Sequence, residues 1–316
     1  MIDGILNINK PADWTSHDVV AKLRVALKLK KIGHGGTLDP MATGVLPIFT
    51  GKATRCVQFF ENADKEYIAG IKFGMVTDTQ DITGNVISNN EGPVSKKELA
   101  DALIKFKGAQ KQIPPMYSAI KIDGKKLYEL ARKGVEVERP ARDIHIYGIE
   151  LLDTEEAENA DSDCRGRSPL RPAEADCANS TENNEYFLRV SCSKGTYIRT
   201  LCHDIGQALG VGAVMSSLQR TVAGGFSIDT ALTLEETLGY ISSNDLDRIL
   251  LPADTIFSQY GQLSLGKEQT EKCKNGVSCL VPNIPDGKYR VYGFENEFLM
   301  FGEIISGKLK MIKGFY

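Results

Sequence analysis

The chain has 316 residues, of which 42% are hydrophobic and 25% charged, and this balance predicts a globular protein with one large and one small domain. It has no run of 18 apolar residues and no signal-peptide pattern at its start, so we expect neither a membrane span nor export. The seven cysteines form no C-x-x-C pair, which argues against a disulfide scaffold or a zinc site and favours a cytoplasmic protein with reduced thiols.

The formal net charge of −3 is unevenly distributed along the chain. Residues 154–184 hold eight acidic and three basic side chains, so the remainder is net positive. This segment is polar and poor in aromatic residues, and we expect it to be a disordered surface insertion. Five basic residues near the N-terminus predict a phosphate-contacting surface, although a solvated helix face has the same composition. They are Lys22, Arg24, Lys28, Lys30 and Lys31.

The first part of the chain predicts three strands and one helix. Apolar and polar residues alternate over 5–9, as in a half-buried strand. Thr15 then offers an N-cap, and apolar residues at helical spacing predict a helix that extends to about Leu29. Apolar runs predict further strands over 45–50 and 66–74.

Two acidic residues, Asp78 and Asp81, lie in a turn-rich stretch that follows these strands. Paired carboxylates raise the possibility of a metal site, but the longer acidic series and terminal glutamate of a calcium loop are missing. We therefore expect both side chains to cap turns.

The middle of the chain alternates helical and extended segments. Ser95 with Glu98 forms a capping box that predicts the start of a helix. Prolines require residues 112–119 to be extended, and a short helix is predicted over 126–133. A strand is predicted over 144–152.

A strand over 186–192 leads into a predicted helix that ends at Leu209. Gly195 breaks the strand, and Thr196 is the expected N-cap of that helix. A second capping box at Thr233 predicts another helix.

The pattern changes near residue 251. Short alternating strands are predicted over 288–294, 298–305 and 309–312, with glycines between them. We expect residues 1–250 to form the large domain and 251–316 to form a small β domain.

Residues 33–48 form the most unusual stretch, because they combine four glycines with a histidine, a carboxylate and two prolines. Glycine permits positive φ angles and close approach of a partner to the backbone. Pro40 keeps Asp39 out of helical geometry, so the carboxylate of Asp39 is presented on a shaped turn. Glycine-rich Asp-Pro turns are common without any function, so composition alone does not distinguish a plain turn from a catalytic loop.

The full string is more specific than its composition. The pattern G-H-x-G-x-L-D-P-x-A-T-G-x-L-P over 33–47 resembles the catalytic loop of bacterial TruB-type pseudouridine synthases. Three further strings of that family occur in the same order: I-P-P-M-Y-S-A-x-K with G-K-K-L-Y-E-x-A-R over 113–132, C-S-K-G-T-Y-I-R-T-L over 192–201, and L-x-R over 218–220. The resemblance covers nearly the whole chain except the acidic segment 154–184.

The resemblance assigns a role to several residues. It implies that Asp39 is the catalytic aspartate, and that Arg199 pairs with Asp39, lowers its pKa and aims its oxygens bidentately. Tyr197 is implied both as a wall of the site and as the base that removes the C5 proton. Asp39 attacks either C6 of the uracil or C1′ of the ribose, and the sequence leaves both routes open.

Four other residues are implied to shape the site or to bind the RNA. Tyr67 and Leu218 hold the uracil after it leaves the stack, and His34 helps to displace it. Lys10 shapes the region of the catalytic loop.

The resemblance implies an α+β fold with a mixed, mainly antiparallel sheet flanked by helices, followed by a PUA-like C-terminal barrel. It implies a tRNA pseudouridine synthase that isomerises uridine 55 of the T-loop and also aids tRNA folding. We expect a cytoplasmic monomer that needs no cofactor, metal or protein partner.

Three alternatives remain open at this point. One is the guided archaeal–eukaryotic relative that works inside a ribonucleoprotein, although its basic tails are absent here. Another is a module that remodels tRNA without chemistry. A third is a phosphate-transferring enzyme with Asp39 as nucleophile, which would require Mg²⁺ and more carboxylates nearby.

Overall fold

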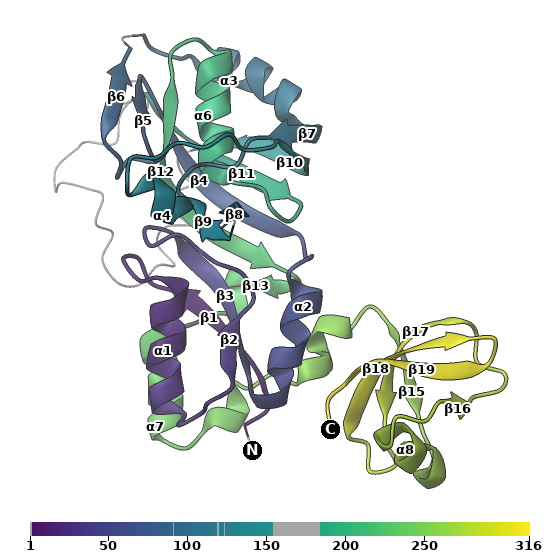
Figure 1. Cartoon of the computed structure of the whole chain (residues 1–316). Coiled ribbons are helices and arrows are strands. Elements are labelled where there is room, and N and C mark those ends of the chain that lie inside the picture. Colours follow the sequence, from purple (N-terminus) through teal and green to yellow (C-terminus); the bar gives the residue numbers. More distant parts are fainter. Residues whose placement is uncertain (1, 91, 119, 123, 154–183) are drawn as a thin grey trace.

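The computed structural model describes residues 2–90, 92–118, 120–122, 124–153 and 184–316 (Figure 1). Of the acidic segment 154–184, only Asn184 belongs to the described residues, so the predicted insertion lies outside them. None of the described helices is long and apolar enough to cross a membrane.

The large domain is built on a ten-stranded sheet, as counted over the described residues. The strands run in the order β14-β1-β3-β12-β4-β11-β10-β7, while β2 pairs with β3 and β13 with β12. They are β1 (Gly4–Lys10), β2 (Ile32–His34), β3 (Thr43–Thr50), β4 (Lys65–Phe73), β7 (Gly108–Gln112), β10 (Arg142–Leu152), β11 (Glu185–Cys192), β12 (Ala213–Ala223), β13 (Phe226–Ser227) and β14 (Leu232–Thr233). Two small hairpins pair β5 (Met75–Thr77) with β6 (Val86–Asn89) and β8 (Lys121–Ile122) with β9 (Lys125–Lys126).

Most neighbouring strands are antiparallel, but β1 with β14 and β3 with β12 are parallel. The sheet is therefore mixed and mainly antiparallel, which confirms the predicted class. The pairing of β3 with β12 is short, with Thr43 opposite Gln219 and Gly44 opposite Arg220. These strands join two halves of the sheet, and the glycine-rich loop ends at their junction (Figure 1).

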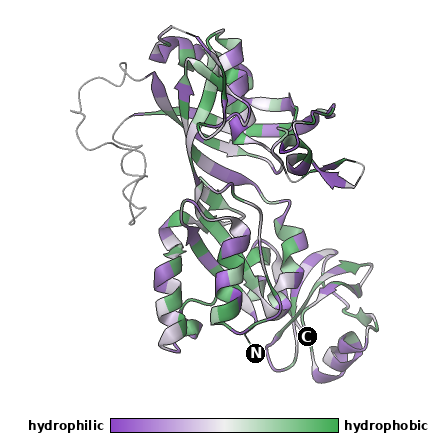
Figure 2. Ribbon diagram, turned by 60° about the vertical axis from the view of Figure 1, so that its left-hand side comes forward, coloured by the Kyte–Doolittle hydropathy of each residue, from purple (hydrophilic) through white to green (hydrophobic). Residues whose placement is uncertain are grey.

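Helices flank the sheet in both halves. They are α1 (Ser16–Ala26), α2 (Val57–Phe60), α3 (Lys96–Leu103), α4 (Leu127–Ala131), α6 (Ile198–Ala208), α7 (Leu234–Ser242) and α8 (Lys267–Lys274), with 3₁₀ turns η1 (Gly51–Cys56), η2 (Ile104–Phe106), η3 (Ile228–Thr230), η4 (Leu246–Arg248) and η5 (Ala253–Phe257). In Figure 2 the helices carry both purple and green bands, as expected for helices with one face on the core and one in solvent.

Both predicted capping boxes are present. Ser95 and Glu98 cap each other's backbone at the start of α3, and Thr233 and Glu236 do the same at α7. Two details differ from prediction. Helix α1 ends at Ala26 rather than near Leu29, and α6 begins after Tyr197 without a side-chain cap, because the Thr196 hydroxyl donates to the carbonyl of Ser193.

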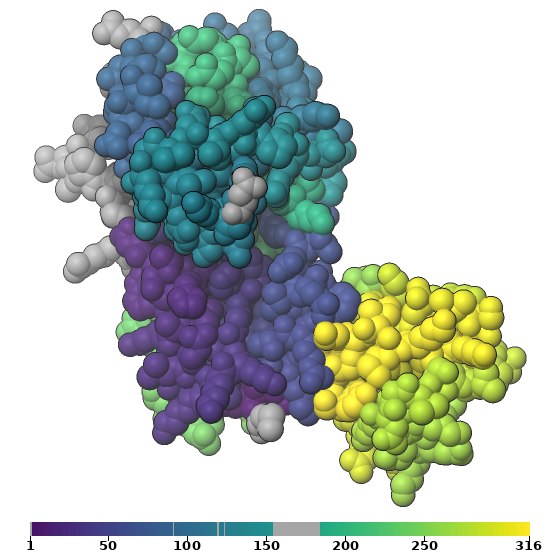
Figure 3. All heavy atoms as spheres, in the orientation of Figure 1, coloured from purple at the N-terminus to yellow at the C-terminus, as the bar shows by residue number. Residues whose placement is uncertain are grey.

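The C-terminal part forms a five-stranded sheet in the order β15-β17-β18-β19-β16. Its strands are β15 (Gly261–Ser264), β16 (Cys279–Leu280), β17 (Gly287–Tyr292), β18 (Phe298–Ile305) and β19 (Lys308–Gly314). The strands predicted over 288–294, 298–305 and 309–312 are thereby confirmed, and the curled sheet fits a PUA-like domain. It forms a separate lobe beside the lower half of the large domain (Figure 3).

Phenylalanine rings connect this lobe to the large domain. Phe59 of α2 packs edge-on against Phe257 and Phe301, with ring centroids 5.2 and 5.6 Å away. Phe257 stacks on Phe301 at 4.2 Å. Because such pairs contribute roughly 0.5–1.5 kcal/mol each beyond their buried area, the cluster holds the lobe firmly on the large domain. The same cluster includes Phe60, which lies directly under the glycine-rich loop.

Candidate active site

The loop that carries Asp39 connects β2 to β3 and is held from both sides of that residue. On one side, the Leu38 N–H donates to the Ser16 hydroxyl at 2.8 Å. On the other side, the Pro40 carbonyl accepts from the Asp13 N–H at 2.9 Å. Since Asp13 and Ser16 lie at the entry to α1, the start of this helix fixes the backbone around Asp39.

The sequence of the loop meets steric demands that only glycine satisfies. Gly44 has a φ of 103°, and a Cβ atom built there would lie 2.2 Å from the Arg220 carbonyl oxygen. A Cβ on Gly35 would lie 2.5 Å from the ring of Phe60. The first glycine therefore permits the parallel pairing of β3 with β12, and the second lets the loop lie on the aromatic cluster.

Arg199, in the first turn of α6, reaches Asp39 with two nitrogens. Its Nε lies 2.9 Å from Oδ2 of Asp39, and its Nη2 lies 3.4 Å from Oδ1. The predicted bidentate contact is therefore present, across 160 residues of chain. The Arg199 side chain is 7% exposed, whereas that of Asp39 is 34% exposed, so the carboxylate has an open side from which a substrate can approach.

A second carboxylate also binds Arg199. Oδ2 of Asp81 lies 3.4 Å from Nη1, and the Tyr117 carbonyl accepts from Nη2 at 2.9 Å. Asp81 also caps its own turn, because its Oδ1 accepts from the hydroxyl of Thr79 and from the N–H and hydroxyl of Thr83. The expected turn-capping role is confirmed, but the contact with Arg199 was missed, since a turn motif gives no sign of a distant partner.

The pKa of Asp39 differs from the expectation. Burial raises the pKa of this carboxyl above its usual value of 3.8, and the opposing pull of Arg199 does not fully compensate. The negative charge of Asp81 adds to the increase, while Lys10 opposes it. Arg199 does lower the pKa of Asp39, as predicted, but the expected net lowering was wrong, because the desolvation of the carboxylate and the second carboxylate on the same arginine outweigh that attraction.

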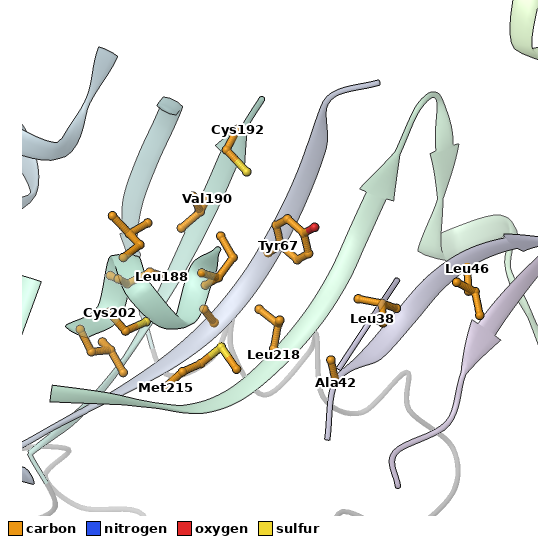
Figure 4. Close-up of a cluster of buried hydrophobic side chains, with 14 of the residues drawn as sticks. Leu38, Ala42, Leu46, Tyr67, Leu188, Val190, Cys192, Cys202, Met215 and Leu218 are labelled. Carbon is orange, nitrogen blue, oxygen red and sulfur yellow. The ribbon is translucent and has the colours of Figure 1, made fainter. Parts of the chain in front are cut away.

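Tyr67 and Leu218 lie side by side on neighbouring strands, β4 and β12 (Figure 4). Each is 8% exposed, and both belong to the same buried cluster as Leu38 and Ala42 of the loop (Figure 4). Burial raises the pKa of the Tyr67 hydroxyl, while the positive charge of Arg220 counteracts part of that increase. An apolar floor with one phenol therefore lies next to the loop that carries Asp39.

Tyr197 lies two residues before Arg199 and is held at the entry to α6. Its N–H donates to Oε1 of Gln112 at 2.8 Å, and its carbonyl accepts from Nε2 of the same side chain at 3.0 Å. Burial raises the pKa of its hydroxyl, and the nearby Asp39 charge adds to the effect. Gln112, which the sequence did not indicate, thus fixes the backbone that carries both Tyr197 and Arg199.

Lys10 is the last residue of β1, and His34 is the last residue of β2, where the loop begins. The Lys10 side chain is fully buried, and its Nζ donates to the carbonyls of Pro11, Trp14 and Pro40 at 2.7, 2.6 and 3.1 Å. Burial lowers the pKa of Lys10 to about 8. His34 is half-buried on β2, and burial lowers the pKa of its imidazole. Its Nδ1 accepts from the Gly36 N–H at 3.3 Å.

The structure thus brings Asp39, Arg199 and Lys10 into one region. The charge of Asp39 also acts on Tyr67 and Tyr197. Leu218 belongs to the same buried cluster as Leu38, and His34 lies where the loop begins. Within the described ranges, no group of three histidine, cysteine, aspartate or glutamate side chains could hold a metal ion. The arrangement presents a partly exposed carboxylate, positioned by an arginine, beside an apolar floor.

Comparisons with known proteins agree with this geometry. Residues 24–198 match the model for the N-terminal domain of TruB family pseudouridylate synthases, and residues 199–258 match the model for the C-terminal domain of tRNA pseudouridylate synthase B. The tRNA pseudouridine synthase B of Clostridium kluyveri is 39% identical over 99% of this chain and its own full length. That of Alkaliphilus oremlandii is 42% identical over 95% of this chain and 93% of its own length.

Solved structures show the same fold. The chain is similar to one from a Cbf5–Nop10–Gar1 complex, with a TM-score of 0.70 and 27% identity over 100% of this chain and 85% of the other. It is also similar to one from an H/ACA ribonucleoprotein bound to a substrate RNA containing 2′-deoxyuridine, with a TM-score of 0.68 and 25% identity over 99% of this chain and 85% of the other. Together with the geometry around Asp39, these matches show that the chain belongs to the TruB family of pseudouridine synthases.

Proposed function

We propose that the protein is a tRNA pseudouridine synthase that isomerises uridine 55 in the T-loop. The observation that carries this proposal is the bidentate contact of Arg199 with Asp39, at 2.9 and 3.4 Å, on a loop that matches the family's catalytic string. The names of the relatives support tRNA as the substrate class. The specificity for position 55, the flipping of the base and the role of Asp39 are parts of the proposal.

The reaction exchanges one glycosidic bond for another. The N1–C1′ bond breaks, the uracil rotates, and a C5–C1′ bond forms; C5 then loses its proton, and N1 gains one. Asp39 attacks as a carboxylate, either at C6 of the uracil or at C1′ of the ribose, and leaves again later. The ionised form is required, and Arg199 supplies the charge that opposes the desolvation of this carboxylate.

The surrounding residues bind the base and move the proton. The uracil leaves the RNA stack and lies against Tyr67 and Leu218, while the imidazole of His34 fills the space that the base vacates. His34 remains neutral in this role, because burial lowers its pKa. Tyr197 relays the C5 proton: burial raises the pKa of its hydroxyl and keeps it protonated, so its oxygen accepts the proton from C5 while the hydroxyl proton passes to solvent. Lys10 keeps the Pro40 carbonyl, and with it the turn at Asp39, in place.

The phenol that accepts the proton is tested by two matched variants. Tyr197→Phe and Tyr67→Phe each remove one hydroxyl and leave a ring of the same shape. With a substrate labelled at C5 by tritium, we expect Tyr197→Phe to slow tritium release more than Tyr67→Phe does. The reverse order would assign the proton to Tyr67.

The proposed activity is tested by incubating the purified chain with an unmodified tRNA transcript and mapping pseudouridine with and without EDTA. We expect pseudouridine at position 55 in both samples and none with Asp39→Asn, although this variant still binds the transcript. An Asp39→Asn variant that forms the product contradicts the mechanism, and loss of product with EDTA supports a metal-dependent reaction instead.

The same assay separates the guided relatives from this proposal. The matching chains of known structure occur in a Cbf5–Nop10–Gar1 complex and in an H/ACA ribonucleoprotein. We expect this chain alone to modify a bare T-arm stem-loop, as a monomer. Activity that appears only after a guide RNA or a protein partner is added would favour the guided class.

A further inference from the structure

A second buried arginine lies on the other side of the Asp39 loop. Arg220, on β12, is 1% exposed. Its Nε donates to the Val45 carbonyl at 2.7 Å, and its Nη2 donates to the Gly36 carbonyl at 3.2 Å. No carboxylate pairs with it among the residues described by the structure. A side-chain hydrogen bond also joins Arg220 to the Tyr67 hydroxyl. This guanidinium is therefore a buried cation whose partners are backbone carbonyls and a tyrosine hydroxyl.

The two carbonyls belong to the two ends of the loop. Gly36 precedes Asp39 and Val45 follows it, so one planar group holds both flanks of the turn that presents the carboxylate. The backbone of Arg220 adds to this hold, because its carbonyl packs tightly against the positive-φ residue Gly44. A change in the Arg220 side chain is therefore transmitted to Asp39 through the backbone on both sides.

The charge of Arg220 also acts on the walls of the site. Arg220 is paired in register with Tyr67 of β4, and its charge opposes the rise in the pKa of the Tyr67 hydroxyl. The same charge contributes to the lowered pKa of His34. Guanidinium groups stay protonated in proteins, so this influence is constant over the working range of pH.

Burying a cation without a carboxylate partner costs free energy, and hydrogen bonds to neutral groups offset only part of that cost. We propose that Arg220 is a positioning residue for pseudouridine formation, which ties both flanks of the Asp39 loop to β12 and places a fixed positive charge beside Tyr67 and His34. This inference rests on the proposed function. Because the side chain is buried, it acts through the loop and the field of the site and makes no contact with RNA.

The inference is tested with Arg220→Lys and Arg220→Gln. Lysine keeps the charge but lacks the planar fork, so it cannot hold both carbonyls in the same way. Glutamine removes the charge. We expect the single-turnover rate constant to fall about tenfold to hundredfold in Arg220→Lys and further in Arg220→Gln, in line with the loss of one or two charge-assisted hydrogen bonds. The dissociation constant for tRNA should stay within about twofold of the parent.

A second readout separates positioning from mere loss of structure. The imidazole of His34 is faced by Arg220 from β12, by His17 from α1 and by the Gly36 N–H. NMR titration of the four histidines, with His34→Gln for assignment, should show a higher His34 pKa in Arg220→Gln than in the parent. Arg220→Lys should keep the low value, because the charge remains.

Leu99→Ala serves as the control for stability. Leu99 is a fully buried core residue of α3, away from the loop, so this variant loses stability while its folded fraction keeps the parental rate. Parental rates in both Arg220 variants, or a loss of tRNA affinity without a loss of rate, overturn the inference. If Arg220→Gln does not fold, the rate and affinity of Arg220→Lys decide. An inactive parent protein contradicts the proposed function itself, so the two failures are distinguishable.

Discussion

Arg199 and Arg220 lie on opposite sides of one loop and are both buried, but their charges are balanced differently. Arg199 lies between two carboxylates, Asp39 and Asp81, whereas Arg220 binds the carbonyls of the loop. A guanidinium with two carboxylates has little charge left to act at a distance, so its effect is local and geometric. Arg220 has no carboxylate partner among the described residues, and its charge acts on Tyr67, His34 and Lys10. Arg199 therefore orients the Asp39 carboxylate, whereas Arg220 holds the backbone of the loop that carries it.

Replacing Arg199 should give the largest effect. In Arg199→Lys, one ammonium group must replace contacts to Asp39, Asp81 and the Tyr117 carbonyl, and it cannot reproduce the bidentate pair. We expect the single-turnover rate constant to fall by about 10²–10³, which corresponds to a loss of roughly 3–4 kcal/mol at the transition state. Rapid-quench assays with saturating enzyme measure this rate.

Arg189→Lys is the matched control for that change, since Arg189 is half-buried on β11 outside the site. Its rate should equal that of the parent. A rate in Arg199→Lys within tenfold of the parent would mean that charge alone, without the planar fork, is sufficient next to Asp39. The proposed distinction between the two arginines would then be wrong.

Asp81→Asn should have an intermediate effect. The variant removes the charge that faces Nη1 of Arg199 while the contact with Asp39 remains, so we expect a rate loss of about tenfold. Thr83→Val is the control, because it removes a turn hydrogen bond to Asp81 without changing any charge. We expect this control to lower the unfolding temperature but to keep the rate. Equal rates for both variants would show that Asp81 only caps its turn and does not influence the reaction through Arg199.

The raised pKa of Asp39 predicts a pH-dependent difference in stability. Above the unfolded value of 3.8, the folded protein contains a carboxylate that its environment disfavours, and this penalty disappears as the pH falls towards 3.8. Asp39→Asn removes the penalty, so its unfolding midpoint should lie above that of the parent at pH 7. The difference should shrink at pH 4. Thermal unfolding at a series of pH values measures it, and a lower midpoint for the variant at pH 7 would show that Arg199 outweighs desolvation.

The parts of the molecule that the sequence predicted well depend on local signals. Capping boxes at Ser95 and Thr233 and the alternating strands require only nearby residues, and they appear as predicted. The contact between Asp39 and Arg199 spans 160 of the 316 residues, yet it was expected because each residue lies in a family string. The partition into residues 1–250 and 251–316 stays a prediction, although the aromatic cluster links the two parts.

The features that were missed depend on tertiary packing. Asp81 and Arg220 acquire their roles only when the turn and β12 are brought against the loop. The end of α1 at Ala26 and the missing cap at Thr196 show that boundary signals compete with contacts made elsewhere. The direction of the Asp39 pKa required a comparison of burial with two opposing charges, and a sequence pattern supplies neither the burial nor the distances.

Replacing exposed cations should have the smallest effect on the rate. Lys22 and Lys28 are exposed on and just after α1, unlike the two buried arginines. Lys22→Gln with Lys28→Gln should weaken tRNA binding about twofold to tenfold and leave the rate at saturating RNA unchanged. If both lysines contact phosphates, the double variant should show a shallower slope of log Kd against log salt, by roughly 0.7–0.9 for each contact that is lost. Lys97→Gln, exposed on α3, is the control and should leave the slope unchanged. An unaltered slope in the double variant would identify this surface as a solvated helix face, and tRNA binding would then depend on other exposed cations.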